Sequence, residues 1–187
     1  MTRSVAVRTT LLALALLSSG CGYNTIQTMD ERVNQAKGQI ETQLQRRADL
    51  VPNLVETVKG VAKQESTVFT SIAESRARLA GAVQSGDVGD MAQANAELTR
   101  GIGRLLAIVE NYPELRSSES FRALQDQLEG TENRISVARQ DYNTAVGELN
   151  AYIRRFPYNL TAKMFGAAPR EYFEAAPGSD VAPEVKF

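Results

Sequence analysis

Few side chains in this sequence belong to the types that most often carry out chemistry, because the chain has no histidine and one cysteine. Histidine is the commonest general base and a common metal ligand, so catalysis would have to use carboxylates, lysine, serine or tyrosine. A lone thiol cannot close a disulfide within the chain or build a cysteine-based metal site. We therefore expect no metal and no cofactor, and the single cysteine, Cys21, is the residue whose surroundings are most informative.

Cys21 directly follows an apolar run over residues 11–17 and the small residues Ser18-Ser19-Gly20. Two arginines and no acidic residue come before it. A positive start, an apolar segment and small residues at a cleavage site are the layout of a secretory signal peptide. A cysteine at the end of this layout resembles the lipobox of bacterial lipoproteins, in which the thiol forms a thioether with a diacylglycerol and becomes the mature N-terminus. Ser18 departs from the pattern, because lipoboxes usually have leucine at that position.

We predict that residues 1–20 are a lipoprotein signal peptide and that Cys21 is lipidated. The apolar run over residues 5–17 is shorter than the roughly 20 residues that a spanning helix needs. A plain cleaved signal peptide with an incidental cysteine is the alternative. The predicted protein is anchored in the cell envelope through its lipid and faces the periplasm or the exterior. Gly22, rather than aspartate, after the cysteine favours the outer membrane, by analogy with the sorting rule of enteric bacteria.

The charge of the remaining chain argues against a nucleic-acid partner. Removing residues 1–20 takes away two arginines and no acid, so the net charge falls from −1 to −3. A nucleic-acid-binding protein needs a basic patch with interleaved aromatic residues, and no such patch is evident in the sequence.

Apolar residues recur at spacings of three and four through almost the whole chain, which is the pattern of amphipathic helices. The stripes and the breaks between them predict helices over about residues 25–48 and 51–84. A third helix is predicted from an N-cap at Asp90 to the Tyr112-Pro113 stop, and a fourth from the Ser117-Ser118 cap to about Phe156.

Strand patterns are absent, so the sequence predicts an all-α fold. Four long amphipathic helices with short connections bury their stripes best as an antiparallel up-and-down four-helix bundle, here over residues 21–157. Residues 158–187 form a C-terminal tail that is rich in aromatic residues, whereas disordered tails are poor in them. We expect the first half of this tail to pack on the bundle and the rest to be looser.

Several stretches are more specific than an apolar stripe requires. The most specific are Gln45-Arg46-Arg47-Ala48-Asp49-Leu50-Val51-Pro52-Asn53-Leu54-Val55, Glu110-x-Tyr112-Pro113-x-Leu115, Glu132-Asn133-Arg134-Ile135 and Ala138-Arg139-x-x-Tyr142-Asn143. In this order and spacing they resemble the LemA family of bacterial membrane-associated proteins, from about Tyr23 to the C-terminus. The resemblance implies a helical bundle outside the cytoplasm behind an N-terminal membrane anchor, with no established enzymatic activity. It also implies an envelope protein as partner, with a TPM-domain membrane protein as one candidate.

The first of these stretches is interpreted as a corner between the first and second helices. Asp49 would cap the helix that Pro52 begins, and Asn53 would lie in its first turn. Arg46 or Arg47 would reach the carbonyl groups that end the first helix. Binding of a partner by these residues is the alternative.

The second stretch is interpreted in the same way. Tyr112-Pro113 would end the third helix and Leu115 would return to the core. Glu110 and Tyr112 are therefore structural candidates, with partner binding again as the alternative.

A further group of polar residues falls on or beside the apolar stripes. Glu65 lies between Val61 and Val68, where a core side chain is expected. Because a buried unpaired charge is costly, Glu65 is predicted to pair with a cation across the core. Arg139 is favoured over Arg76, which shares the helix of Glu65 and is out of its reach.

The same face of the fourth helix carries Glu132, Tyr142 and Asn143, which are predicted to extend a network that fixes helix register. A ligand-binding polar pocket and an acid site are the alternatives. A di-metal centre in a bundle would need Glu-x-x-His motifs, which a chain without histidine cannot supply.

The sequence therefore predicts a lipid-anchored scaffold or interaction module of the cell envelope and not an enzyme. Glycine-rich phosphate loops and nucleophile motifs are missing, as is histidine. A binding protein for a small or lipidic ligand between the helices is the first alternative. An enzyme that uses Glu65, Glu110 and Glu132 is the second.

Overall fold

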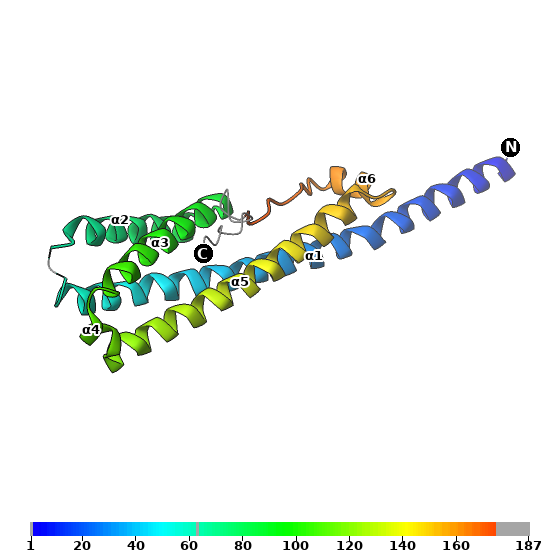
Figure 1. The fold of residues 1–187 in the computed structure, drawn as a ribbon. Coiled ribbons are helices and arrows are strands. Elements are labelled where there is room, and N and C mark those ends of the chain that lie inside the picture. The colour runs from blue at the N-terminus through cyan, green and yellow to red at the C-terminus, as the bar shows by residue number, and fades with distance from the viewer. Residues whose placement is uncertain (1, 63, 175–187) are drawn as a thin grey trace, which may run out of the picture. The chain divides into compact units, whose positions relative to one another are not determined.

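The computed structural model describes residues 2–62 and 64–174, and the side chains of residues 22–62 and 64–174. Every regular element in this part of the chain is an α-helix, which confirms the all-α fold class. The helices are α1 (Thr2–Lys59), α2 (Ser66–Ser85), α3 (Val88–Val109), α4 (Pro113–Ser117), α5 (Glu119–Arg154) and α6 (Tyr158–Met164) (Figure 1). The side chain of Cys21 and the last part of the tail, predicted to be looser, lie outside the described residues.

The chain divides into two compact units. The first unit comprises Met1–Lys37 and Asp141–Glu171, so it holds the beginning of α1, the end of α5 and α6. The second unit comprises Gly38–Gln140 and Tyr172–Phe187, so it holds the end of α1, all of α2, α3 and α4, and the beginning of α5.

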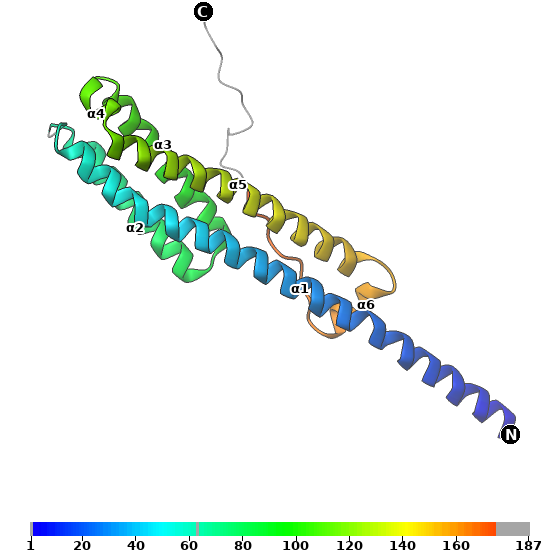
Figure 2. The ribbon, with the colours of Figure 1, turned by 90° about the horizontal axis from the view of Figure 1, so that it is seen from below.

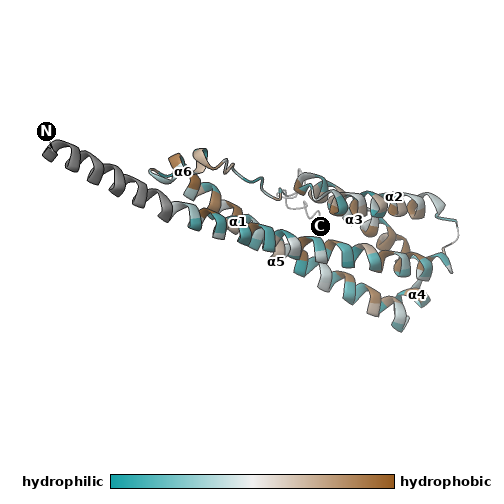
Figure 3. Ribbon diagram, turned by 180° about the vertical axis from the view of Figure 1, so that it is seen from behind, coloured by the Kyte–Doolittle hydropathy of each residue, from teal (hydrophilic) through white to brown (hydrophobic). Residues whose placement is uncertain are grey.

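The core of the second unit consists of the apolar stripes expected from the sequence. Each of its long helices buries residues at spacings of three and four, and hydrophobic and hydrophilic residues alternate along the ribbons (Figure 3). The fully buried members with the largest side chains include Leu44, Leu54, Ile72, Leu79, Met91, Leu98, Leu105 and Phe121. These stripes are therefore the part of the fold that the sequence predicts best.

The predicted corner at Pro52 is wrong. Pro52 lies inside α1, which continues to Lys59, and the connection to α2 lies at residues 60–65. Asp49 is therefore an interior residue of α1, exposed on its surface, and accepts a hydrogen bond from Gln45 Nε2 at 3.0 Å. It does not cap a helix.

A contact from α2 explains how α1 accommodates Pro52. Proline has no N–H, so the carbonyl of residue 48, four positions earlier, loses its helical hydrogen bond. Ala48 is buried, and an unpaired carbonyl there would be costly. Arg76 on α2 donates its Nε–H to the Ala48 oxygen at 2.7 Å. The arginine thus supplies the donor that the proline lacks.

The hairpin of α2 and α3 is defined by its turn and by one close approach. The two helices pack side by side (Figures 1 and 2). Gly86 ends α2 in the left-handed conformation, with φ of 72°, which favours glycine. Gly101 on α3 lies so near α2 that a Cβ there would be 3.1 Å from Ile72 Cγ1. Close helix approach therefore accounts for this glycine.

The N-cap of α3 is Asp87 and not Asp90. The Asp87 carboxylate accepts a hydrogen bond from the Asp90 amide at 2.8 Å, and Asp90 lies in the first turn. The sequence placed the start of this helix only a few residues late, but it assigned the cap to the wrong aspartate.

Asp87→Ala is expected to lower the free energy of unfolding by about 0.5–2 kcal/mol, as loss of an N-cap does. Asp49→Ala is the matched control and should change it by no more than about 0.5 kcal/mol, because Asp49 is an exposed residue inside a helix. Urea denaturation midpoints of the two variants provide the comparison. Equal destabilisation by both changes would contradict this assignment.

The links between α3 and α5 follow the sequence more closely. Tyr112 precedes Pro113, the first residue of α4, and the Tyr112 carbonyl accepts hydrogen bonds from the amides of Leu115 and Arg116. Leu115 is buried, as predicted. Ser118 precedes α5, and its hydroxyl accepts from the Phe121 amide at 3.3 Å.

The first unit is built around the beginning of α1 and the end of α5. Within this unit the buried hydrophobic side chains of α1 include Ile26, Val33 and Ala36, and those of α5 include Val146, Leu149 and Ile153. Beyond α5, the short helix α6 contributes Thr161 and Ala162 to the buried side, and the segment after it returns along α5.

Candidate functional site

Arg47 is the centre of a polar network in the second unit. Its side chain is buried, with the residue only 4% exposed. Its Nη1 donates a hydrogen bond to Asn95 Oδ1 on α3 at 2.8 Å and forms a salt bridge with Glu132 Oε2 on α5. One guanidinium group of α1 therefore links two further helices.

The electrostatics of this network are those of a structural ion pair. Burial lowers the pKa of the Arg47 guanidinium from its ordinary value, and the Glu132 carboxylate opposes that shift. The Glu132 side chain is about half-exposed, so water solvates one side of the pair. Arg47 Nε is buried and has no hydrogen-bond partner in the described structure. The pair satisfies most, but not all, of the polar atoms that it buries.

The predicted pair of Glu65 and Arg139 is not formed in the described structure. Glu65 lies in the connection just before α2, half-buried, and Arg139 is half-buried on α5. The reason is the position of the break between the first two helices. Since that break lies at residues 60–65 rather than near residue 50, the stripe to which Glu65 was assigned ends before it.

The remaining sequence candidates of this unit are mostly at the surface. Arg46 and Asn53 are exposed on α1. Glu110 is exposed and pairs with Arg116 at 2.9 Å, while Tyr112 is half-buried beside α4. The structure therefore joins only Arg47 and Glu132 of the predicted residues in one network.

A second polar cluster lies in the first unit and holds the segment after α6. Asn150 Nδ2 donates to the Arg170 carbonyl at 2.9 Å, and its Oδ1 accepts from the Arg170 amide at 2.8 Å. The Tyr142 hydroxyl donates to the Glu171 carbonyl at 2.8 Å. The Arg170 guanidinium makes two hydrogen bonds to the Asp30 carboxylate, at 2.9 and 3.0 Å.

Burial raises the pKa of the Tyr142 phenol, and the nearby Arg170 charge opposes the shift. The phenol is therefore held in its neutral form, in which it can donate the hydrogen bond to residue 171. Asn143 is half-buried on the next position of α5. Tyr142 thus acts here as an anchor for the tail and shows no sign of activation as a base.

Only part of these two clusters could be recognised from the sequence. Asn150 and Tyr142 interrupt the apolar stripe of α5, which marks them as polar groups with buried partners. Asn95, Asp30 and Arg170 carry no such mark, because they lie at helix surfaces or in an irregular segment. No periodicity distinguishes these three residues from ordinary solvent-exposed ones.

Asn150→Leu is expected to weaken the docking of the 170–171 segment by about 1–2 kcal/mol, because it removes two hydrogen bonds. A loss of that size corresponds to roughly 5–30-fold faster hydrogen exchange of the Arg170 amide, which donates to Asn150. Buried amides of α3, such as that of Leu98, serve as the internal control. Unchanged exchange at Arg170 would mean that other contacts hold the segment.

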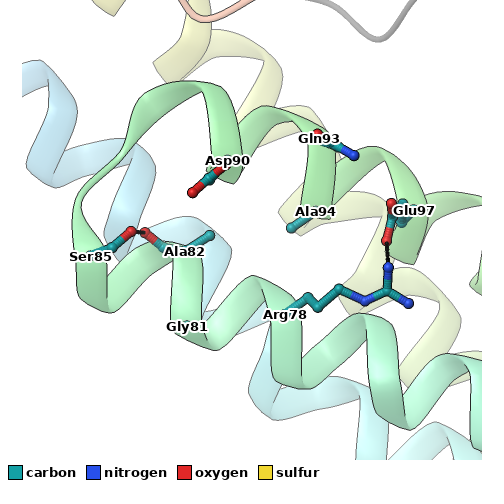
Figure 4. Close-up of a pocket in the computed structure, with 8 residues that line it drawn as sticks. All are labelled: Arg78, Gly81, Ala82, Ser85, Asp90, Gln93, Ala94 and Glu97. Atoms are coloured by element: carbon teal, nitrogen blue, oxygen red, sulfur yellow. Dashed lines mark hydrogen bonds and ion pairs between the residues drawn. The ribbon is translucent and has the colours of Figure 1, made fainter.

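An open pocket of about 360 Å³ lies between α2 and α3. Figure 4 shows Arg78 and Glu97 reaching toward each other across it, with their Nη1 and Oε2 atoms 2.8 Å apart. The Ser85 hydroxyl donates to the Ala82 carbonyl of its own helix. Arg78 and Glu97 therefore pair with each other at this pocket, and Asp90 is the third charged residue that lines it.

A second pocket, of about 410 Å³, lies in the first unit. It is lined by Ile26, Asp30 and Leu149 and by the segment over residues 165–170. Asp30 and Arg170 are paired with each other there. Within the described residues no group of three or more acidic, histidine or cysteine side chains could hold a metal ion.

The fold and its polar clusters define a class of protein. It is an all-helical protein whose most specific polar residues tie helices to one another and hold a C-terminal segment. In the described part of the chain, none of the helices combines the length and the apolar character needed to cross a bilayer.

The chain belongs to the LemA family, whose profile matches residues 36–187. The motifs in the sequence indicate the same family of membrane-associated helical proteins. The match covers the whole of the second unit and, in the first unit, residues 36–37 and 141–171.

Curated relatives include magnetosome proteins of two bacteria. Magnetosome proteins MamQ 1 and MamQ 2 of Paramagnetospirillum magneticum are each 28% identical to this chain over 181 residues, covering 84% of this chain. Magnetosome protein MamQ of Magnetospirillum gryphiswaldense is 26% identical over 181 residues. The chain spans 66% of the length of these relatives, slightly less than two thirds.

Proposed function

We propose that this protein is a lipid-anchored scaffold of the bacterial cell envelope. Acylated Cys21 would hold it to the membrane, with its helices in the periplasm or at the exterior. The helical segments of the second unit would serve as an antiparallel four-helix bundle that presents a stable surface to a partner protein.

The proposal rests on one observation: the motif residues make contacts that hold the fold together. Arg47 and Glu132 join α1 to α5, and Arg76 compensates for Pro52. Tyr142 and Asn150 hold the backbone of the tail. These contacts stabilise a fold, and they engage the polar groups with structural partners, whereas catalytic or binding groups would converge on a cavity.

The relatives support a membrane-related role without defining it. Their name connects MamQ with the magnetosome. For this chain we propose a structural helical protein that works at a membrane, with an envelope protein such as a TPM-domain membrane protein as its partner.

Cys21→Ser is expected to abolish acylation and to leave the precursor uncleaved, because only a thiol can form the thioether. The intact mass of the membrane-extracted protein measures both effects. Ser19→Ala is a suitable control, since it keeps a small residue near the cleavage site and should leave acylation unchanged. A wild-type protein with a free thiol at residue 21 would refute lipid anchoring.

The scaffold role is tested separately by crosslinking in cells. A photo-crosslinker placed at exposed Arg46 or Asn53 on α1 should capture one defined envelope protein. The same crosslinker at Arg100, an exposed residue of α3, is the control for a different surface. Absence of any defined adduct from several exposed positions would argue against a scaffold.

A binding protein for a small or lipidic ligand is the second candidate, and the pocket of the first unit favours it. Its volume of about 410 Å³ falls within the range of small-molecule sites. Native mass spectrometry of protein extracted from membranes would detect a retained ligand. Ala168→Trp, at the edge of that pocket, should then remove the extra mass.

A further inference from the structure

The short helix α6 has a buried side and an exposed apolar side, and the exposed side has no partner in the described structure. Thr161 and Ala162 face the rest of the first unit and are buried. Leu160 and Met164, four positions apart and hence on one face, are 59% and 66% exposed. A seven-residue helix with apolar groups on its outer side is unusual for a surface in contact with water.

Neighbouring residues enlarge this exposed apolar surface. Phe156, just before α6, is 79% exposed, and Phe165, just after it, is also exposed. The Phe165 ring packs on Tyr23 of α1, with ring centroids 4.5 Å apart. We call Phe156, Leu160, Met164 and Phe165 the α6 surface. Figure 3 shows hydrophobic residues on this helix.

The α6 surface lies beside the start of the predicted mature chain. Gly22 packs so closely on α6 that a Cβ there would be 2.8 Å from Tyr158 Cδ1. Both views place α6 next to α1 (Figures 1 and 2). The backbone of residue 21 is one residue, about 3.8 Å, further along the chain. No linker therefore separates the lipidation site from the folded part of the first unit.

The charge of this region also differs from that of the whole chain. Residues 149–170 contain four basic residues, Arg154, Arg155, Lys163 and Arg170, and no acidic residue. Residues 1–29 contain no acidic residue either. The whole chain, by contrast, has 22 acidic residues and a net charge of −1. Basic and apolar residues together suit a bilayer that contains anionic lipid.

We infer that the α6 surface inserts into the interfacial region of the bilayer in which Cys21 is anchored. The inference rests on the proposed lipid anchor, which brings α6 to the membrane. Leu160, Met164 and the two phenylalanines would enter the boundary between headgroups and acyl chains, while Arg154, Arg155 and Lys163 contact lipid phosphates. The protein would then be held at two points and in one orientation.

The test uses the full chain, processed in cells and reconstituted into vesicles of phosphatidylcholine and phosphatidylglycerol. Leu160→Cys and Met164→Cys each accept an environment-sensitive fluorophore, and the vesicles carry a spin-labelled lipid as quencher. Because an interfacial helix buries its apolar face about 5–10 Å into this boundary, the quencher should reduce emission by at least about half. Val137→Cys on α5, at a site that is also 59% exposed, is the matched control and should not be quenched.

The outcome separates this inference from the lipid anchor itself. The chain without an introduced cysteine takes up no fluorophore if Cys21 is acylated, and its intact mass shows the acyl groups. Acylation without quenching at 160 and 164 would overturn the inference and leave the anchor intact. Without acylation, a free Cys21 thiol would carry the fluorophore in every variant, so quenching at 160 and 164 in excess of that of the Val137→Cys control would support the α6 surface and refute the anchor. Absence of quenching, combined with protection of residue 160 from a water-soluble thiol reagent in cells, would assign the surface to a partner protein and overturn the inference.

Discussion

Glu132→Ala is expected to lower the free energy of unfolding by about 2–3 kcal/mol. Removing one member of a fully buried ion pair costs about 3–5 kcal/mol, because the other charge stays buried without a partner. Arg47 is buried, but Glu132 is half-exposed, so water replaces part of the lost interaction and the effect is smaller. Denaturation by urea, followed by circular dichroism, measures the change.

A double-mutant cycle shows whether the loss comes from Arg47. Arg47→Met removes the charge and keeps much of the apolar volume, so Glu132→Ala should cost clearly less in that background. Glu129→Ala is the control on the same helix, since Glu129 is exposed and bonds to Gln125 within its own helix. Equal costs of Glu132→Ala with and without Arg47 would show that the two residues do not interact.

Arg76→Met is expected to cost about 1–3 kcal/mol, because it leaves the buried Ala48 carbonyl without a donor. The effect should depend on Pro52. In a Pro52→Ala background the amide of residue 52 can again bond to the Ala48 carbonyl, so the same arginine substitution should cost much less.

Thermal and chemical denaturation of the four proteins, wild type, both single variants and the double variant, measures this coupling. Arg100→Met, which replaces an exposed arginine of α3, is the control for general effects of the substitution. If Arg76→Met is equally costly in the wild-type chain and in the Pro52→Ala background, the arginine has another role and the explanation for the uninterrupted helix is wrong.

The sequence predicted the helical content and most of the core because both follow from periodicity. Residues such as Leu44, Leu98 and Val146 occupy stripe positions and are fully buried. The spacing of apolar residues is a property of the local sequence, so it can be recognised without knowledge of the tertiary structure. The Tyr112-Pro113 stop and the end of the fourth helix near Phe156, which Pro157 follows, were predicted for the same reason, since proline acts on its own segment.

The break between α1 and α2 could not be predicted by the same local rule. A proline inside a helix is tolerated when a distant residue satisfies the freed carbonyl, and here that residue is Arg76, 28 positions from Ala48. Because the sequence placed the break near residue 50, Glu65 was assigned to a buried stripe of the second helix. That assignment led to the predicted pair with Arg139, which does not form. The pair that does form, Arg47 and Glu132, joins residues 85 positions apart in the sequence. Which side chains of α1 and α5 face each other depends on where α1 ends.

The contact between Asn150 and residue 170 has a consequence for mutational tolerance. The amide side chain bonds to the N–H and the C=O of the peptide backbone, which every residue except proline presents in the same way. In a saturation mutagenesis experiment that measures docking of this segment, most side chains at position 170 should therefore be tolerated, with the loss of one exposed salt bridge. Proline should not be tolerated there, because it has no N–H. Position 150 should accept almost none, because its role depends on the length and the two-sided hydrogen bonding of asparagine.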